Sequence, residues 1–266
     1  MTDPGPHLLG RTPSPPDERD FRLSQFMTGD DNLLSRALAE LKKTTTGYQY
    51  YVTKGADPPK SSHWFKALTL LGQTGVFWWP GVRDVSWTVS KQLDQGQTNH
   101  CVGFGWAGWS VAEPYQNVTY GDTAAHDIYY EIKVIEGEPG QENGAWVRSG
   151  AKAMQARKRL GAYAFADTIE EIQTYLHTKG PVVVGTDWTD DMFAPDAAGY
   201  VKPTGAVAGG HCYLLMGELL GEDAFLFQNS WGAGWGQNGR FKMKTADFAQ
   251  VFANQGEAVA SLELAL

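Results

Sequence analysis

The spacing of apolar residues predicts several helices along the chain. Residues 30–43 have one apolar helical face, formed by Leu33, Leu34, Ala37, Leu38 and Leu41. Helices are also expected over residues 61–72, 147–161 and 168–180. The last of these starts with a capping box of Thr168 and Glu171, and Gly180 stops it.

Runs of β-branched and aromatic residues predict strands in the last third of the chain. Strands are expected over residues 181–187, 211–219, 223–230 and 239–244. The second and third are joined by the turn-like stretch 220–223 and should pair as an antiparallel hairpin. With this hairpin centred near residue 220, His211 and Asn229 would lie opposite each other at its open end.

Composition divides the chain into two parts. Residues 1–18 are rich in Pro and Gly and predict an extended or disordered arm. The segment WWPGVRD around Pro80 marks a change of composition, so the boundary is placed there. An N-terminal extension, residues 1–80, would then precede a main domain, residues 81–266, whose helices and strands predict an α+β fold.

Charge and cysteine content exclude several classes of protein. The net charge is −8, so a nucleic-acid-binding surface is not expected. No apolar run approaches the roughly 18 residues of a membrane-spanning helix, and the first residues lack the pattern of a secretory signal. Cys101 and Cys212 are the only cysteines, too few for a disulfide framework, so a reducing compartment, the cytoplasm, is expected.

The stretch QGQTNHCVGFGWAGW, residues 95–109, is the first candidate for chemistry. Gly103, Gly105 and Gly108 would each cost about 1 kcal/mol relative to alanine inside a helix, so a helix here must be buried with another backbone close to it. The same glycines match a dinucleotide-binding loop, but the preceding residues are polar rather than strand-like. Cys101 is then either a small core residue or a nucleophile whose thiolate the helix N-terminus stabilises.

A nucleophilic thiol needs a general base, and His211 in the C-terminal part of the chain is the candidate. In the expected hairpin, Asn229 can hydrogen-bond one ring nitrogen of His211 and fix its tautomer. Gln95 can donate its amide to a developing oxyanion, alongside the backbone N–H of Cys101. His100 is an alternative base, but adjacent side chains in the first turn of a helix point apart.

Three segments, QGQTNHC, GGHC and NSWGAGWGQNGRFKM, resemble the signature segments of papain-like cysteine peptidases, in the same chain order. By this resemblance Cys101 is the nucleophile, His211 is the general base and acid, and Asn229 orients the histidine. Gln95 is implied as the oxyanion donor. Trp231 is implied as the indole that shields the hydrogen bond between histidine and asparagine.

The resemblance covers roughly residues 81–266 and implies a papain-like, two-lobed α+β fold. A helical lobe with the nucleophile helix would pack against an antiparallel β-rich lobe. Gly144 is placed where a substrate backbone pairs, and Cys212 in the wall of the main specificity pocket. Thr98 departs from the pattern, because secreted members have a disulfide cysteine there. The short separation of Cys101 and the histidine is typical of compact bacterial or phage relatives.

The expected function is hydrolysis of peptides or proteins by a cysteine endopeptidase. The remaining histidines lack metal-binding spacing, so no metal or other cofactor is expected, and neither nucleic acid nor membrane is an expected partner. One alternative is a cell-wall peptide amidase or transpeptidase that uses the same residues. Another is a catalytically inactive, ligand-binding member of the fold. Residues 1–80 would be a latency segment, a structural belt or a partner-binding arm.

Overall fold

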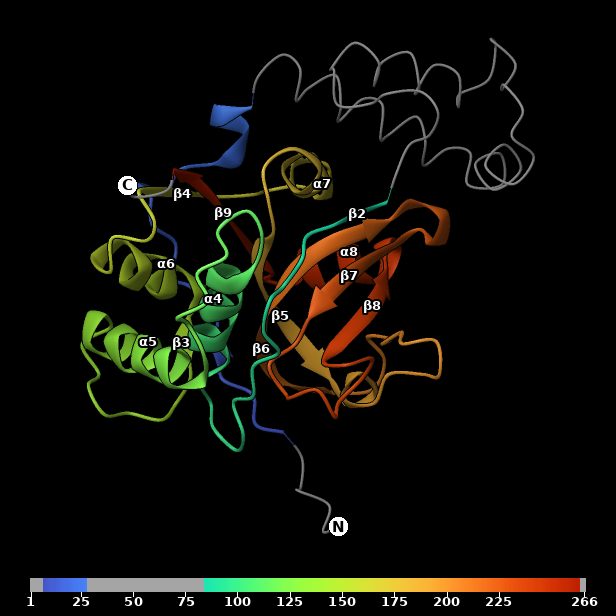
Figure 1. Ribbon diagram of the computed structural model, residues 1–266, viewed down its shortest axis with the longest axis horizontal. Helices are drawn as coiled ribbons and strands as arrows, with labels where there is room; N and C mark the ends of the chain where they lie inside the picture. Colours follow the sequence, from blue (N-terminus) through green and yellow to red (C-terminus); the bar gives the residue numbers. More distant parts are fainter. Residues whose placement is uncertain (1–6, 28–83, 264–266) are drawn as a thin grey trace.

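The computed structural model describes residues 7–27 and 84–263 (Figure 1). The helices expected over 30–43 and 61–72, and the boundary at residue 80, lie outside these ranges. In the described part of the chain, no helix combines the length and the apolar character needed to cross a membrane.

The helices are α4 (Cys101–Val111), α5 (Asp122–Ile135), α6 (Val147–Ala156), α7 (Ile169–Thr178) and α8 (Thr245–Ala253), with 3-10 turns η1 (Leu23–Phe26), η2 (Asp190–Phe193) and η3 (Leu220–Glu222). The strands are β1 (Arg11–Thr12), β2 (Val85–Ser86), β3 (Ala145–Trp146), β4 (Ala162–Phe165), β5 (Val182–Thr189), β6 (Val207–Leu219), β7 (Ala224–Gln228), β8 (Arg240–Lys244) and β9 (Glu257–Glu263).

A seven-stranded antiparallel sheet is the centre of the described structure. The strands follow the order β4-β9-β5-β6-β7-β8, and β2 pairs with β6. Helices α4, α5 and α6 gather beside this sheet (Figure 1). The expected α+β fold, with a helical lobe against a β-rich lobe, is confirmed.

The central strands separate two hydrophobic cores. Val183 on β5 and Leu214 on β6 face the core built with α4, α5 and α6. Their neighbours Val184 and Tyr213 face a second core that includes residues of α7 and α8. Successive side chains of a strand point to opposite faces, and each fully buried apolar side chain contributes roughly 1.5–3 kcal/mol. Strands β5 and β6 therefore contribute side chains to both cores and connect the two lobes.

Helix α4 is buried along its whole length, and its glycines permit two close contacts. A β-carbon at Gly103 would lie 2.4 Å from the carbonyl oxygen of Ala125 on α5. A β-carbon at Gly105 would lie 2.7 Å from the sulfur of Cys212 on β6. At Gly108 an added β-carbon would meet nothing within 4 Å. The expected close approach of another backbone is thus confirmed at Gly103, whereas Gly105 makes room for a side chain; together they fix α4 between α5 and β6.

The hairpin of β6 and β7 is present, but its register differs from the expected one. Leu214 pairs with Gln228, whereas a hairpin centred at residue 220 would pair it with Leu226. The turn is displaced because η3 occupies it and Asp223 adopts a left-handed conformation with φ of 46°. His211 consequently lies beyond the paired part of the hairpin, and its cross-strand neighbour is on β5.

Helices α6 and α7 confirm the helices expected over 147–161 and 168–180. The hydroxyl of Thr168 accepts the Glu171 N–H at 3.1 Å, which is one half of the expected capping box. The Glu171 carboxylate accepts the N–H of Asp167 instead of that of Thr168. Helices α5 and α8 and strands β4 and β9 were not expected from the sequence.

The described N-terminal residues, 7–27, run without a helix until η1 and are anchored on the main domain. Strand β1 pairs in parallel with β3, which is otherwise outside the sheet. Asp20 accepts a hydrogen bond from Arg148 on α6, and Leu23 is buried in the second core. The first part of the extension is therefore integral to the fold.

Candidate active site

His211 and Asn229 are joined by a hydrogen bond between two buried side chains. Nε2 of His211 lies 2.8 Å from Oδ1 of Asn229, and the same oxygen accepts the Ser230 N–H at 2.8 Å. The carboxamide oxygen is an acceptor only, so Nε2 carries the proton. Nδ1 of His211 has no hydrogen-bond partner in the described structure, and it is the nitrogen free to accept a proton.

Aromatic rings enclose the imidazole. Trp231 stacks on His211 with ring centroids 4.6 Å apart and an interplanar angle of 24°. Trp188 meets the same ring edge-on at 4.9 Å. The bond between His211 and Asn229 is buried beside these indoles, and a hydrogen bond is stronger in such a low-dielectric setting.

Cys101 is the first residue of α4, and the packing of α4 on β6 brings it to the histidine strand. Its sulfur lies against the backbone of Cys212, the residue after His211. Both Cys101 and His211 are fully buried. Burial raises the pKa of the Cys101 thiol to about 11, and burial lowers the pKa of His211 to about 4. The two groups are thus a neutral thiol and a neutral imidazole in this state.

Gln95 is held by two hydrogen bonds to Ser230, the residue after Asn229. Its backbone N–H donates to the Ser230 carbonyl at 2.8 Å, and its side-chain oxygen accepts the Ser230 hydroxyl at 2.7 Å. These bonds turn the amide nitrogen away from Ser230. The nitrogen donates to the Thr98 carbonyl at 2.7 Å and to the Leu8 carbonyl at 3.1 Å. Gln95 is therefore oriented to donate to a carbonyl oxygen in the site.

Residues 7–12 cross the site as an extended chain, defined here as the cleft segment. His7 stacks on Trp231 with ring centroids 4.4 Å apart and an angle of 4°. The Leu8 carbonyl is the one that Gln95 binds. The segment thus contacts two side chains that the sequence assigned to the site.

Gly10 lies where the cleft segment passes Cys101. Its carbonyl accepts the Ala145 N–H at 2.7 Å. Its backbone contact with the Cys101 sulfur favours the thiolate, which is the effect of an N–H donor. A β-carbon at residue 10 would lie 1.9 Å from the Asn99 carbonyl oxygen, so only glycine fits.

Gly144, expected to pair with a substrate backbone, lies one residue before the pairing itself. Its φ is 90°, and an added β-carbon would lie 2.7 Å from the Gly10 carbonyl oxygen. Gly144 thereby leaves room for the cleft segment, whereas the hydrogen bond comes from Ala145, which is in register with Arg11. The sequence motif that singled out Gly144 carried no signal for Ala145.

The Arg11 side chain fills a pocket next to the thiol. Its side chain is 0% exposed, and Nη2 and Nε lie 2.8 and 3.2 Å from the Glu257 carboxylate. Gly185 and Gly210 flank the residue and leave space that a side chain would occupy. Sequence reasoning missed Glu257, because it lies far from every motif and becomes part of the site only through β9.

Cys212 and His100 do not act as reactive groups in this arrangement. The Cys212 sulfur packs against Gly105, and burial raises the pKa of its thiol well above the usual value. His100 stacks on Tyr129 and lies 2.6 Å from both the His126 Nδ1 and a Glu142 carboxylate oxygen. The alternative base is thus held by other partners. In the described ranges no cluster has the composition of a metal site.

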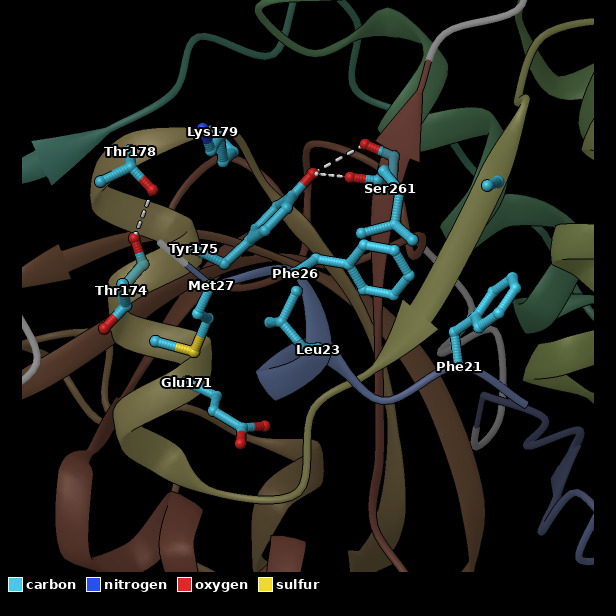
Figure 2. Close-up of a pocket in the computed structure, with 12 residues that line it drawn as sticks. Phe21, Leu23, Phe26, Met27, Glu171, Thr174, Tyr175, Thr178, Lys179 and Ser261 are labelled. Atoms are coloured by element: carbon cyan, nitrogen blue, oxygen red, sulfur yellow. Dashed lines mark hydrogen bonds between the residues drawn. The ribbon is translucent and has the colours of Figure 1, made fainter. Parts of the chain in front are cut away.

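A separate groove of about 430 Å³ lies between η1, α7 and β9 (Figure 2). Its lining is mostly apolar and includes Phe21, Phe26 and Tyr175, whose hydroxyl donates to the Ser261 carbonyl at 2.7 Å. None of the thiol, imidazole or carboxamide groups of the candidate site lines it. The groove is therefore separate from the candidate site at Cys101.

Comparison with known proteins identifies the family. The papain family of cysteine proteases matches residues 88–259, and the chain belongs to this family. It is 35% identical over 109 residues to cathepsin B of Dictyostelium discoideum, a match that covers 40% of this chain and 33% of the relative. It is 34% identical over 84 residues to cathepsin B-like cysteine proteinase 5 of Caenorhabditis elegans, covering 31% and 24% respectively. The matched part spans only a quarter to a third of these relatives.

Solved structures show the same fold. Xylellain, a cysteine protease from Xylella fastidiosa, superimposes with a TM-score of 0.57 at 16% identity over 96% of both chains. Digestive procathepsin L 3 of the Tenebrio molitor larval midgut gives a TM-score of 0.52 at 15% identity, covering 92% of this chain and 98% of that one. The papain-like α+β fold expected from the sequence is confirmed.

The neutral state of the thiol predicts the pH dependence of its alkylation. Because a buried thiol with a pKa of about 11 ionises only in strong base, the iodoacetamide rate at Cys101 should keep rising through neutral pH toward that value. Mass spectrometry assigns the labelled cysteine. A plateau well below the roughly 8.5 pKa of a free thiol would instead show that the thiolate already exists in the full chain.

Proposed function

We propose that this protein is a cysteine endopeptidase whose reaction centre is Cys101, His211 and Asn229, with Gln95 as oxyanion donor. The Cys101 thiol gives its proton to Nδ1 of His211 and attacks a peptide carbonyl. Gln95 and the Cys101 backbone N–H stabilise the oxyanion of the tetrahedral intermediate. His211 then protonates the leaving amine, and water hydrolyses the thioester.

The proton route follows from the tautomer. The proton on Nε2 of His211 stays in the hydrogen bond to Asn229, so Nδ1 is the only ring nitrogen that can accept the thiol proton. When Nδ1 takes that proton, the ring becomes a cation, and the Asn229 oxygen stabilises it through a charge-assisted bond. Asn229 thus orients the base and stabilises its charged form.

The cleft segment is the observation that carries the proposal. Its six residues support a site beside Cys101 that accepts an extended peptide, because the Leu8 carbonyl binds Gln95 and the Gly10 carbonyl binds Ala145. The chain continues on both sides of the thiol, which favours cleavage within a polypeptide over cleavage at its end. The bound chain is ordinary protein backbone, which favours a protein substrate over a cell-wall peptide.

The same segment implies latency. An N–H group of Gly10, not a carbonyl carbon, faces the Cys101 sulfur, so the segment presents nothing to attack. It also covers both reactive groups and keeps them neutral. We therefore assign residues 7–12 to a latency segment, one of the roles considered for the extension.

The surroundings of Arg11 indicate which substrate side chain would bind in its place. Glu257 pairs with the guanidinium, and the Gln255 carbonyl accepts a further bond from it. A buried carboxylate that loses its cationic partner is strongly disfavoured. An arginine-containing substrate restores that pairing once the segment has left, so arginine is preferred at this position.

Substitution Gly10→Ala in the full-length chain should activate the enzyme. The new β-carbon would overlap the Asn99 carbonyl and expel the segment, which should raise both Cys101 alkylation and hydrolysis of an arginine-containing fluorogenic peptide at least about 10-fold, equivalent to losing about 1.4 kcal/mol of docking energy. Gly121→Ala is the matched control, because a β-carbon there meets nothing within 4 Å.

Two other results would redirect the interpretation. If Gly10→Ala alkylates fast but cleaves no peptide, the chain is the inactive, binding member of the fold. If it cleaves only cell-wall cross-links, the amidase alternative holds. Peptide cleavage that persists in Gly10→Ala with Cys101→Ser would rule out the proposed nucleophile.

Glu257→Gln should reduce the preference for arginine. In the Gly10→Ala chain, the ratio of kcat/KM for an arginine peptide over its leucine counterpart should fall about 10-fold or more, because a charge-assisted bond contributes roughly 1.5–3 kcal/mol. Parallel assays of the two peptides measure the ratio. An unchanged ratio would mean that Arg11 occupies a pocket the substrate does not use.

A further inference from the structure

Strand β3 is a short piece of backbone that needs support from outside the sheet. It consists of Ala145 and Trp146, and in the described residues its strand partner is β1 of the cleft segment alone. When that segment leaves, β3 has no strand beside it. Something else must then hold the Ala145 N–H where a peptide can bind it.

Two side chains from the end of α5 bind the opposite edge of this backbone. Nζ of Lys133 donates to the Gly144 carbonyl at 3.0 Å, and Oε1 of Glu136 accepts the Trp146 N–H at 2.8 Å. Alternate residues of an extended chain direct their polar groups to the same edge. These two bonds therefore lie on the edge away from Ala145, in the place of a neighbouring strand.

The two side chains are also bonded to each other. Nζ of Lys133 lies 2.9 Å from Oε2 of Glu136 and 2.7 Å from Oε2 of Glu138. The Lys133 and Glu136 side chains are only 2% and 3% exposed. A buried ion pair is a poor source of stability compared with apolar packing. The pair has another role here, because it supplies hydrogen bonds to two backbone groups beside β3, the Gly144 carbonyl and the Trp146 N–H.

Helix α5 also packs against α4, the helix that begins with the proposed nucleophile Cys101. Helix α5 contacts α4 where the Ala125 carbonyl meets Gly103, so the backbone at Ala145 and the helix of Cys101 are both anchored on α5. Misplacing a bound carbonyl by about 1 Å can slow a reaction about 100-fold. A fixed distance between Ala145 and the thiol is therefore useful to catalysis.

We propose that Lys133 and Glu136 are positioning residues for the peptide substrate, which replace a missing strand and hold Ala145 in register with Cys101. They touch neither the substrate nor the thiol. The proposal rests on the proposed function only in taking a peptide as the ligand.

The test measures peptide binding without requiring hydrolysis. In the full-length Gly10→Ala chain, the synthetic peptide HLLGRTPS, which matches residues 7–14, should protect Cys101 from iodoacetamide. The double variant Lys133→Met with Glu136→Leu removes both charges together, so no buried charge is left unpaired and the fold should persist. We expect protection to need about 10-fold more peptide, with the iodoacetamide rate in the absence of peptide changed less than about 2-fold.

Two further variants separate positioning from general stability. Lys133→Arg keeps a donor and a charge and should bring peptide protection back to within about 3-fold of the parent. Glu131→Gln, also on α5, breaks the partly buried pair of Glu131 with Arg157 at the end of α6 and should leave protection unchanged. Thermal unfolding of each variant shows that its fold is retained.

The proposal is overturned if the double variant binds the peptide as well as its parent. It is also overturned if the iodoacetamide rate without peptide changes in proportion, since the nucleophile itself would then be disturbed. Failure of the proposed function looks different, because the parent Gly10→Ala chain would bind HLLGRTPS and yet hydrolyse no peptide.

Discussion

The close packing of α4 between α5 and β6 is the constraint on which the site depends. Gly103 admits the Ala125 carbonyl and Gly105 admits the Cys212 sulfur. Any larger residue at either position would push α4 away and carry the thiol with it. A glycine-rich helix is intrinsically weak, since each glycine costs about 1 kcal/mol relative to alanine. The helix is nevertheless stable because it is completely buried. The free energy gained by burying its apolar side chains exceeds the free energy lost through the low helix propensity of glycine.

The same tight packing couples the protonation of the site to the docking of the cleft segment. With residues 7–12 in place, both Cys101 and His211 are buried and uncharged. An ion pair between them would need solvation or polar contacts that the covered site lacks. Conditions that favour the charged pair therefore disfavour docking of the segment by the same free energy, because linkage between two equilibria is reciprocal. Under the latency role proposed for residues 7–12, the covered site and the un-ionised thiol are one state.

The sequence motifs proposed the candidate groups of the site without showing how they are arranged in space. Cys101, His211, Asn229, Gln95 and Trp231 were identified from local motifs, because each role needs a particular functional group in a particular chain order. The hairpin register was wrong, since a 3-10 turn and a left-handed Asp223 cannot be read from alternation alone. Even so, Asn229 still reaches His211, because a carboxamide can bridge neighbouring positions that are not directly opposed.

Residues that act across long sequence separations were not predictable. Glu257 meets Arg11 only after β9 has joined the sheet, and Ala145 could not be distinguished from Gly144 without knowing which edge of the strand faces the cleft. The buried Lys133 belongs to a helix that the sequence analysis did not anticipate. Both cysteines are free, so no disulfide braces the loop before β3. Ion pairs and hydrogen bonds from the end of α5 hold that loop instead.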